Sequence, residues 1–378
     1  MLRATVALVV LGLGLSLVAA QPPAPAPAVT MDDIKKAWQE RQDKVKTLKM
    51  SWTQRVTHPK GSLTDALSAA VGKKFTEPQP PRDLLLEGTC QFHLTDDGKY
   101  SLETKCESWS HLKQAPRPYH TRLFFDGRHH FSEQLPTEPG SNPTLVASKP
   151  KQVSGELRTI GTYPIFWLFR GVDESFTERM LDQFEITGRY VTRLGRACLE
   201  LVETSRIEGQ TRSLYLDRGR GWLPVSLVVR TGAAPTLQLD IEYQPEPVTG
   251  WYPASWSYSA NRPNGQLRES VRFAVTECRI NDAVAAPAFV PALAPGTHLI
   301  DFREGDEGTQ TVVKEDGSLG RTLPLRSQLT YDEVKAESAK PDAVWRAVAI
   351  WACVAALVVS VGVACLLRWK RRTPSSPA

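Results

Sequence analysis

Residues 49 to 279 mostly alternate between apolar and polar side chains with a period of two, the pattern of half-buried β-strands. Turn signals such as Asp126-Gly127, Gly219-Arg220-Gly221 and Asn264-Gly265 separate the alternating runs. Many short strands joined by tight turns predict one large antiparallel sheet rather than βαβ units. Because a sheet of about a dozen strands normally curls, we predict an open half-barrel. The predicted strands are Lys49–Thr57, Asp83–Leu94, Tyr100–Glu107, Tyr119–Phe125, His129–Gln134, Glu185–Arg193, Cys198–Thr204, Thr211–Asp217, Leu223–Arg230, Thr236–Tyr243, Ala254–Ser259 and Glu269–Arg279.

Three segments do not alternate and are predicted to contain helices. In Met31–Leu48 the apolar residues recur at helical spacing, and Thr30 with Asp33 forms an acidic version of a capping box. Ser62–Lys74 is a weaker helix, and Tyr163–Phe184 is an apolar block followed by a helical stretch. The fold class is therefore mainly β (α+β), a curled antiparallel sheet whose concave face is covered by helices.

The C-terminal region contains the longest segment without a charged residue. Residues 347–367 include no charge and no proline, and as a helix they span about 30 Å, the thickness of a bilayer core. Four cations follow at once, Arg368, Lys370, Arg371 and Arg372, and this excess predicts a cytoplasmic C-terminus. We therefore predict one C-terminal transmembrane helix, 347–367, and a short cytoplasmic tail, 368–378.

The N-terminus is consistent with that orientation. One cation, Arg3, precedes an apolar run that ends in small residues, which predicts a signal peptide over 1–20 with cleavage after Ala20. An uncleaved N-terminal anchor is the alternative. A Pro/Ala linker follows over 21–30, and 306–343 is predicted to be a polar stalk with one hairpin around Asp316-Gly317. Because the one sequon-like triplet contains Pro143, the chain fits a bacterial envelope, as a single-pass inner-membrane protein with its main domain in the periplasm.

Charge and cysteine content limit the class of partner. Arg3 and the four tail cations account for the whole excess of 46 basic over 41 acidic residues, so the ectodomain is neutral and nucleic-acid binding is excluded. Four cysteines lie outside the anchor, in a compartment where disulfides form. Cys90 and Cys106 flank a predicted hairpin turn at Asp97-Gly98 and are nearly opposite each other, so a cross-strand disulfide is one interpretation. Cys198 and Cys278 are the remaining pair.

No catalytic motif, metal-ligand spacing or phosphate-binding loop is present, so we predict a protein that is not an enzyme and has no cofactor and no metal. Apolar and aromatic surface is what remains. An open sheet partly covered by helices has a concave side, which is the usual form of a ligand site. The candidate lining residues are Trp38, Trp52, Phe166, Trp167 and Phe169, each of which would equally suit an ordinary core.

The arrangement of these segments resembles the lipoprotein-carrier (LolA-like) superfamily of the bacterial envelope. The resemblance covers residues 31–305 and rests on the helix "IKKAWQERQDKVKTLKMSW", the hairpin "GTCQFHLTDDGKYSLE" and the strands "LYLDRGRGWLPVSLVVR", "LQLDIEYQ" and "GWYPASWSYS". It ends in "VTECRINDAVAAPAFVPALAPGTHLIDFREG". It implies an open, curled sheet whose apolar interior receives acyl chains. The anchor is a departure from the soluble carriers of that superfamily.

Two functions follow as expectations. The first is a membrane-anchored extracytoplasmic protein that holds a lipid, or the acyl group of a lipidated protein, in an apolar cavity by burial. The second is a non-catalytic regulatory or structural ectodomain that acts by contact with an envelope protein. Inward-facing aromatic side chains that are fully packed favour the second function, whereas an empty groove favours the first.

Overall fold

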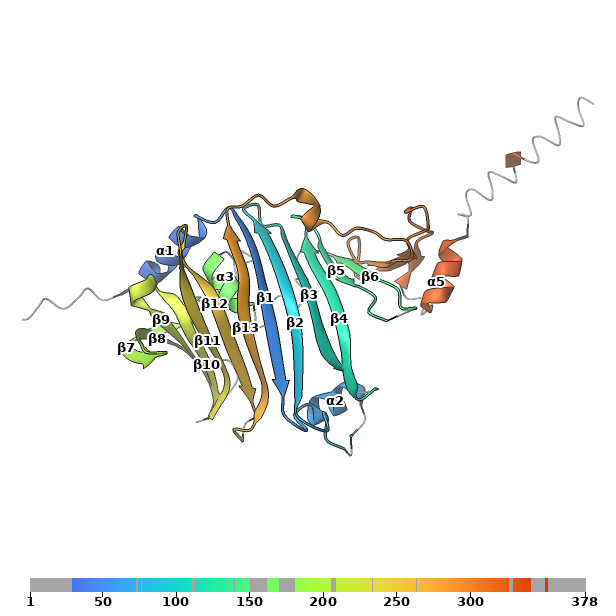
Figure 1. The fold of residues 1–378 in the computed structure, drawn as a ribbon. Coiled ribbons are helices and arrows are strands. Elements are labelled where there is room, and N and C mark those ends of the chain that lie inside the picture. Colours follow the sequence, from blue (N-terminus) through green and yellow to red (C-terminus); the bar gives the residue numbers. More distant parts are fainter. Residues whose placement is uncertain are drawn as a thin grey trace, which may run out of the picture.

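One sheet of sixteen strands organises the protein (Figure 1). The computed structural model describes residues 29–72, 74–75, 77–110, 113–138, 140–149, 162–169, 181–204, 209–232, 234–262, 264–325, 329–340 and 351–352. The strand order is β16-β15-β14-β6-β5-β4-β3-β2-β1-β13-β12-β11-β10-β9-β8-β7, and β16 and β7 are its two edges. Among these strands every neighbouring pair is antiparallel except β14 with β6. The strands are β1 (Thr47–His58), β2 (Leu84–Thr95), β3 (Tyr100–Ser110), β4 (Ala115–Phe125), β5 (His130–Gln134), β6 (Thr144–Ser148), β7 (Glu185–Arg193), β8 (Arg196–Thr204), β9 (Gln210–Asp217), β10 (Leu223–Thr231), β11 (Ala234–Glu246), β12 (Gly250–Asn261), β13 (Leu267–Ile280), β14 (His298–Asp301), β15 (Thr309–Val312) and β16 (Leu323–Pro324).

The sheet confirms the prediction of a mainly β fold built on a large, open, antiparallel sheet. Each of the twelve strands predicted from alternation is present, most of them a few residues longer than predicted. Four strands were not predicted, β6, β14, β15 and β16, and each is only two to five residues long. Runs this short seldom contain enough residues for alternation to be recognised, and β5, also five residues long, is the exception.

The helices are short and few among the described residues. They are α1 (Met31–Gln42), α2 (Thr64–Val71), α3 (Tyr163–Phe169) and α5 (Tyr331–Ser338), with 3₁₀ turns η1 (Arg218–Arg220) and η2 (Ala286–Phe289). Helix α1 begins with the predicted capping box, in which Thr30 and Asp33 each accept a hydrogen bond from the other's backbone N–H. It ends earlier than predicted because Leu48 belongs to β1, where it is fully buried by strand alternation.

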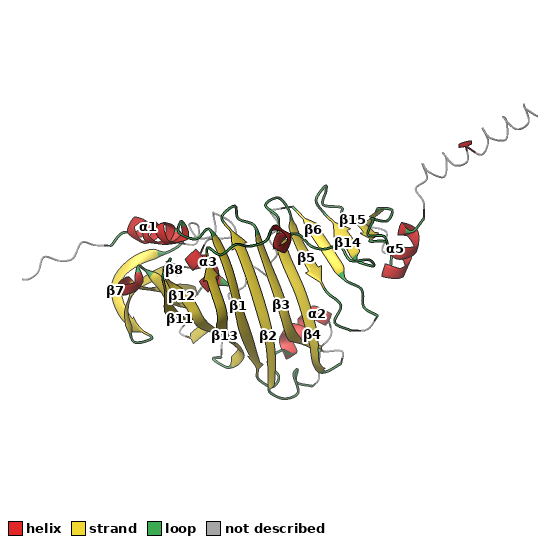
Figure 2. Cartoon of the chain, turned by 45° about the horizontal axis from the view of Figure 1, so that its top comes forward, coloured by secondary structure: helices red, strands yellow, loops and turns green. Residues whose placement is uncertain are grey.

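The two faces of the sheet differ in chemistry. On the face that we call the apolar face, β1 contributes Met50 and Trp52, which are opposite Phe92 of β2 and Val275 of β13. Helices α1 and α3 lie together at the end of the sheet that carries β7 to β12 (Figures 1 and 2). Phe166 of α3 meets Phe92 edge to face, with ring centroids 6.1 Å apart. The other side of the sheet, which we call the polar face, carries the residues between these, such as Thr53 and Arg55 of β1.

The C-terminal part differs from the predicted polar stalk. Segment 306–343 contains β15, β16 and α5, and β15 pairs with β14, so the sheet continues past residue 305. A bridge between Val313 and Leu319 closes the hairpin predicted around Asp316-Gly317. Val334 of α5 is buried in a small cluster with Val312 and Leu323. The polar composition of 306–343 led to the prediction of a stalk, because the small core formed by β15, β16 and α5 contains only a few apolar residues.

The described residues include no helix that is long and apolar enough to cross a bilayer. The predicted signal peptide, 1–20, and most of the linker, 21–30, lie outside the described residues. The predicted transmembrane segment, 347–367, lies outside them as well, apart from Trp351 and Ala352. The basic tail, 368–378, is not among them either.

Candidate functional site

The five aromatic residues predicted to line a cavity lie in one packed core. Trp38 is on α1, Trp52 on β1, and the other three on α3, and all five belong to the same cluster of buried side chains. Their exposed fractions are 4% or less, and Trp167 and Phe169 are at 0%. The Trp38 indole N–H donates to the Trp222 carbonyl over 2.8 Å, which fixes α1 against the start of β10. The structure brings all five together, and they fill the space between the helices and the sheet.

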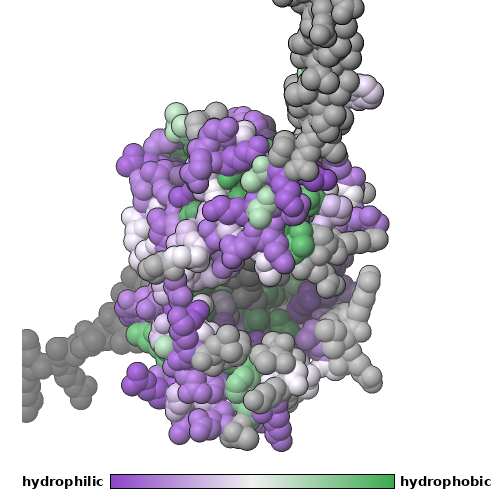
Figure 3. All heavy atoms as spheres, turned by 90° about the vertical axis from the view of Figure 1, so that its right-hand side faces the viewer, coloured by the Kyte–Doolittle hydropathy of each residue, from purple (hydrophilic) through white to green (hydrophobic). Residues whose placement is uncertain are grey.

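One buried polar atom in this core has no partner. Trp52 packs against Trp256, with ring centroids 5.8 Å apart, and its Nε1 is buried without a hydrogen bond. A buried indole N–H usually finds an acceptor, because leaving it unpaired costs about 1–3 kcal/mol. Figure 3 also shows a hollow in the side of the molecule that it presents, with hydrophobic residues in its depth.

The four cysteines outside the predicted anchor, Cys90, Cys106, Cys198 and Cys278, are free thiols, so neither candidate disulfide is present. The turn between β2 and β3 has three residues, since Thr95 pairs with Lys99, and the register therefore places Cys90 opposite Thr104 and Cys106 opposite Gly88. The two thiols are diagonal neighbours on the apolar face, and such neighbours are commonly about 7–8 Å apart, too far for a disulfide. Burial raises the pKa of Cys90 to about 12, so its thiol is protonated and unreactive. Cys198 and Cys278 lie on β8 and β13, which are not neighbouring strands.

A cluster of ionisable side chains crosses the polar face of β3 to β5. Glu103 accepts hydrogen bonds from His120 at 2.7 Å and Lys105 at 2.9 Å, and Arg122 lies between Glu103 and Glu133. Burial raises the pKa of Glu103, but the hydrogen bonds from Lys105 and His120 and the charge of Arg122 outweigh it and lower the pKa to about 2. Burial also raises the pKa of Glu133. Every charge here has an opposite neighbour, so the cluster holds three strands together.

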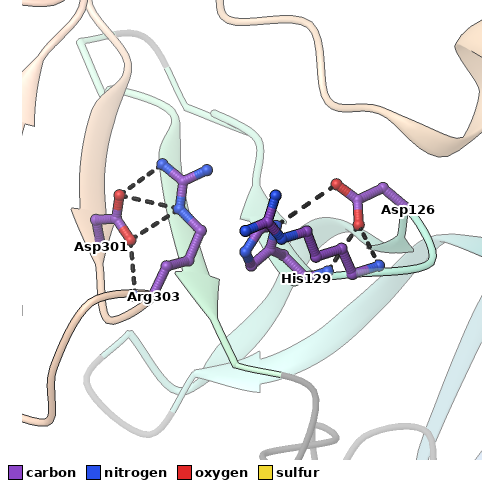
Figure 4. Close-up of polar contacts among 5 residues, drawn as sticks. Asp126, His129, Asp301 and Arg303 are labelled. Carbon is purple, nitrogen blue, oxygen red and sulfur yellow. Dashed lines mark hydrogen bonds and ion pairs between the residues drawn. The ribbon is translucent and has the colours of Figure 1, made fainter.

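A second set of ion pairs lies at the turn of the β4–β5 hairpin and at the end of β14, with β6 between them (Figure 4). Asp126 accepts the backbone N–H groups of Arg128 and His129, both at 2.7 Å, and its carboxylate lies 3.8 Å from His129 Nδ1. Arg303 donates to both oxygens of Asp301, at 2.6–3.0 Å. Within the described residues no group of three or more His, Cys, Asp or Glu side chains could hold a metal ion. These contacts close a turn and the end of a strand.

An open trough of about 940 Å³ lies on the polar face. Strand register shows that it is built from two neighbouring rows of directly opposed residues. The first row runs from β11 to β2 through Asp240, Ser257, Arg272, Arg55 and Glu87. The second row runs from β11 to β3 through Glu242, Ser255, Ala274, Thr53, Thr89 and Lys105.

The second row explains why the space is hollow. Its four middle residues, Ser255, Ala274, Thr53 and Thr89, have short side chains, whereas long charged side chains stand at both ends and along the first row. Leu194, at the tip of the β7–β8 hairpin, adds an exposed apolar side chain to the wall. The volume falls within the range of about 300–1,000 Å³ that ligand sites occupy.

The charges in the trough are not neutralised locally. Arg55 pairs with Glu87 over 2.8 Å, but Arg272, directly opposite Arg55, makes no ion pair or hydrogen bond with any described residue. Like charges directly opposite each other destabilise a sheet. Asp240 and Glu242 accept hydrogen bonds from neutral side chains only, and neither has a cationic partner in the described ranges. Uncompensated charges of both signs therefore face the same cavity.

Reasoning from the sequence did not predict this site. The period-two pattern identified each polar residue as solvent-facing, but it gives no information about which residues of different strands are opposite one another. The signal that could have found it is the run of small residues on the polar side of adjacent strands, where longer side chains would be expected.

The comparisons with known proteins give no family. No protein-family model matches the chain, and no curated protein matches it either. Among solved structures, two crystal forms of PNGF-II, in space groups P21 and C2, are similar over 68% of this chain at 8% identity, with TM-scores of 0.22 and 0.21. The chain spans about a third of the length of those structures, since 31% of each is covered. A likeness this low carries no argument about fold or function.

Proposed function

We propose that this chain is a non-catalytic binding protein of the bacterial envelope, anchored in the inner membrane by 347–367, that acts by contact with an envelope partner. The observation that carries the proposal is the position of the open space. The aromatic residues of the apolar face are packed, with exposed fractions of 4% or less, whereas the polar face carries a trough of about 940 Å³. Because the apolar face is packed and the polar face has the open trough, we expect a partner to bind on the polar face.

The anchor supports the same function. A protein fixed to the inner membrane does not shuttle cargo across the envelope, and it presents its binding face to partners that come to it. The open antiparallel sheet with α1 and α3 on one face is compatible with the LolA-like resemblance over residues 31–305, which remains a prediction.

A second candidate function is the holding of a lipid or of a lipidated protein's acyl group. Two observations favour it, the hollow in Figure 3 and the unpaired indole N–H of Trp52. An ester carbonyl that entered the apolar side would supply the missing acceptor, and each buried methylene would add about 0.8 kcal/mol.

Site-specific photo-cross-linking of the full chain in cells separates the two functions. A photoreactive amino acid replaces Ala274, in the middle of the trough, or Val56, half-buried on the apolar face. We expect a discrete protein adduct at Ala274 and no lipid adduct at Val56. The matched control is Leu319, an exposed apolar residue in the β15–β16 hairpin, which should form neither.

The opposite result would replace the proposal. If mass spectrometry identified lipid on the Val56 variant and the Ala274 variant formed no adduct above the Leu319 control, the protein would be a lipid-holding protein and the trough would be ordinary solvated surface.

A further inference from the structure

The trough contains a positive and a negative side chain that do not form an ion pair with each other. Arg272 and Asp240 lie in the same row with only β12 between their strands, a separation of about 10 Å at 4.8 Å per strand. No ion pair joins the two side chains, because Asp240 accepts hydrogen bonds from Ser226 and Gln238 instead. We infer that the trough binds an extended peptide segment that carries one acidic and one basic side chain. This inference rests on the proposed function, because it specifies the chemistry of the partner.

The basic end of the trough is suited to a carboxylate. Arg272 has all its guanidinium donors free of described partners and stands opposite Arg55, whose charge is partly offset by Glu87. A carboxylate placed between the two arginines would relieve their repulsion and accept the paired hydrogen bonds that guanidinium groups prefer to give. The repulsion between Arg272 and Arg55 destabilises the free protein, and a bound anion would remove it.

The acidic end is suited to an ammonium or guanidinium group. Asp240 and Glu242 lie on the same side of β11, two residues apart. Asp240 is held by Ser226 Oγ at 2.7 Å and Gln238 Nε2 at 2.6 Å, so its carboxylate is fixed in position before any ligand binds. A cation there would form charged hydrogen bonds with two carboxylates at little entropic cost.

The floor of the trough selects an extended chain. The second row crosses five strand spacings between Glu242 and Lys105, about 24 Å, which is the length of about seven residues of extended peptide. Between those ends the small residues leave room for a backbone, and the hydroxyl oxygens of Ser255, Thr53 and Thr89 can accept hydrogen bonds from peptide N–H groups. The described lining includes exposed Leu194, and its two aromatic residues, Trp256 and Phe273, are buried, so no exposed aromatic ring is present on which a base or a sugar could stack.

Fluorescence anisotropy with the full chain in detergent micelles tests the inference. The probe is a fluorescein-labelled heptapeptide, Gly-Ser-Glu-Ser-Lys-Ser-Gly, in which the two charges lie on one side of an extended backbone. Control peptides replace its Glu or its Lys by Gln. We expect saturable binding at low salt, weakened about fivefold by either replacement and further weakened by added salt.

Protein variants identify the site. Arg272→Gln should weaken binding of the parent peptide about fivefold, yet should leave the affinity for the peptide without Glu unchanged, because the contact is then already lost. Ala274→Trp should abolish binding by filling the floor. The matched control is Arg279→Gln, since Arg279 is exposed on the same strand, lies outside the trough and already pairs with Glu277.

Two outcomes would overturn the inference. One is the absence of saturable binding to the peptide, and the other is equal binding by the Arg272→Gln protein. A protein adduct at Ala274 in cells together with either outcome would retain the proposed function and reject only the ligand chemistry. The absence of both peptide binding and the adduct would reject the trough as a binding site.

Discussion

Single side chains decide whether the apolar side of the sheet is a core or a cavity. Trp38 is 1% exposed and joins α1 to the start of β10 through its indole N–H. Trp38→Ala should lower the free energy of unfolding by about 3–5 kcal/mol, because it leaves a cavity and an unpaired carbonyl. Denaturant unfolding of the full chain in micelles measures the change, with Tyr190→Ala, at a site 48% exposed, as the control. A Trp38→Ala protein of nearly unchanged stability would mean that this side of the sheet is loosely packed and open.

Glu103 should make stability depend on pH. Its pKa in the folded protein is about 2, below the ordinary value of 4.5, so the carboxylate stabilises the native state above about pH 4.5. This stability is lost as the pH falls from about 4.5 towards 2. Unfolding midpoints at about pH 6 and about pH 3 should therefore differ more for the natural protein than for Glu103→Gln. The same pH dependence in both proteins would show that the cluster contributes no such linkage.

Individual elements were predicted from sequence to the extent that they were long enough to have a period. β1 to β3 and β10 to β13 are nine to fourteen residues long, and most of them alternate, although the first six residues of β10 are all buried. β14, with four residues, pairs in parallel with β6, which lies more than 150 positions earlier. Local sequence contains no information about such a long-range pairing. For the same reason the five aromatic residues were identified as inward-facing, while the opposition of Arg272 and Arg55 was not foreseen.

The pairing of β2 with β3 depends on a glycine. A Cβ at Gly88 would lie 2.5 Å from Cys106 Cβ and 2.8 Å from the Lys105 carbonyl oxygen, closer than real contacts allow. Gly88→Ala should therefore destabilise the protein by about 1–3 kcal/mol, although alanine is otherwise the better residue in a strand. Thermal or denaturant unfolding gives the difference. Gly305→Ala, where a Cβ meets nothing within 4 Å, is the matched control.

A second substitution tests the cause of that effect. Cys106→Gly in the Gly88→Ala background removes the closer of the two clashes, so the cost of Gly88→Ala should be smaller there than in the natural protein. Additive costs would show that the two residues are not in contact and that the register of the hairpin is different.

At the scale of the whole molecule, the two faces of one sheet have separate roles. The apolar face packs against α1 and α3 and stabilises the fold. The polar face does not have to form a core. A polar face that only had to be soluble would distribute its charges in local pairs, as β3 to β5 do around Glu103. The trough departs from that arrangement, and its unpaired Arg272 is the feature that stability alone does not account for.

The proposed anchor determines where that face can act. Residues 347–367 carry no charge and precede four cations, so the full chain should stay in the membrane fraction after a high-salt or alkaline wash. A chain that ends after Lys340 should instead be released into the periplasmic fraction. Leu357→Lys, near the middle of the segment, should reduce insertion, because a lysine there costs about 3 kcal/mol. A tag after Ala378 should be accessible only from the cytoplasm. If the washed membranes lost the full chain, or if the tag were accessible from outside, the segment would not anchor the protein as proposed, and the polar face would meet its partners free in solution.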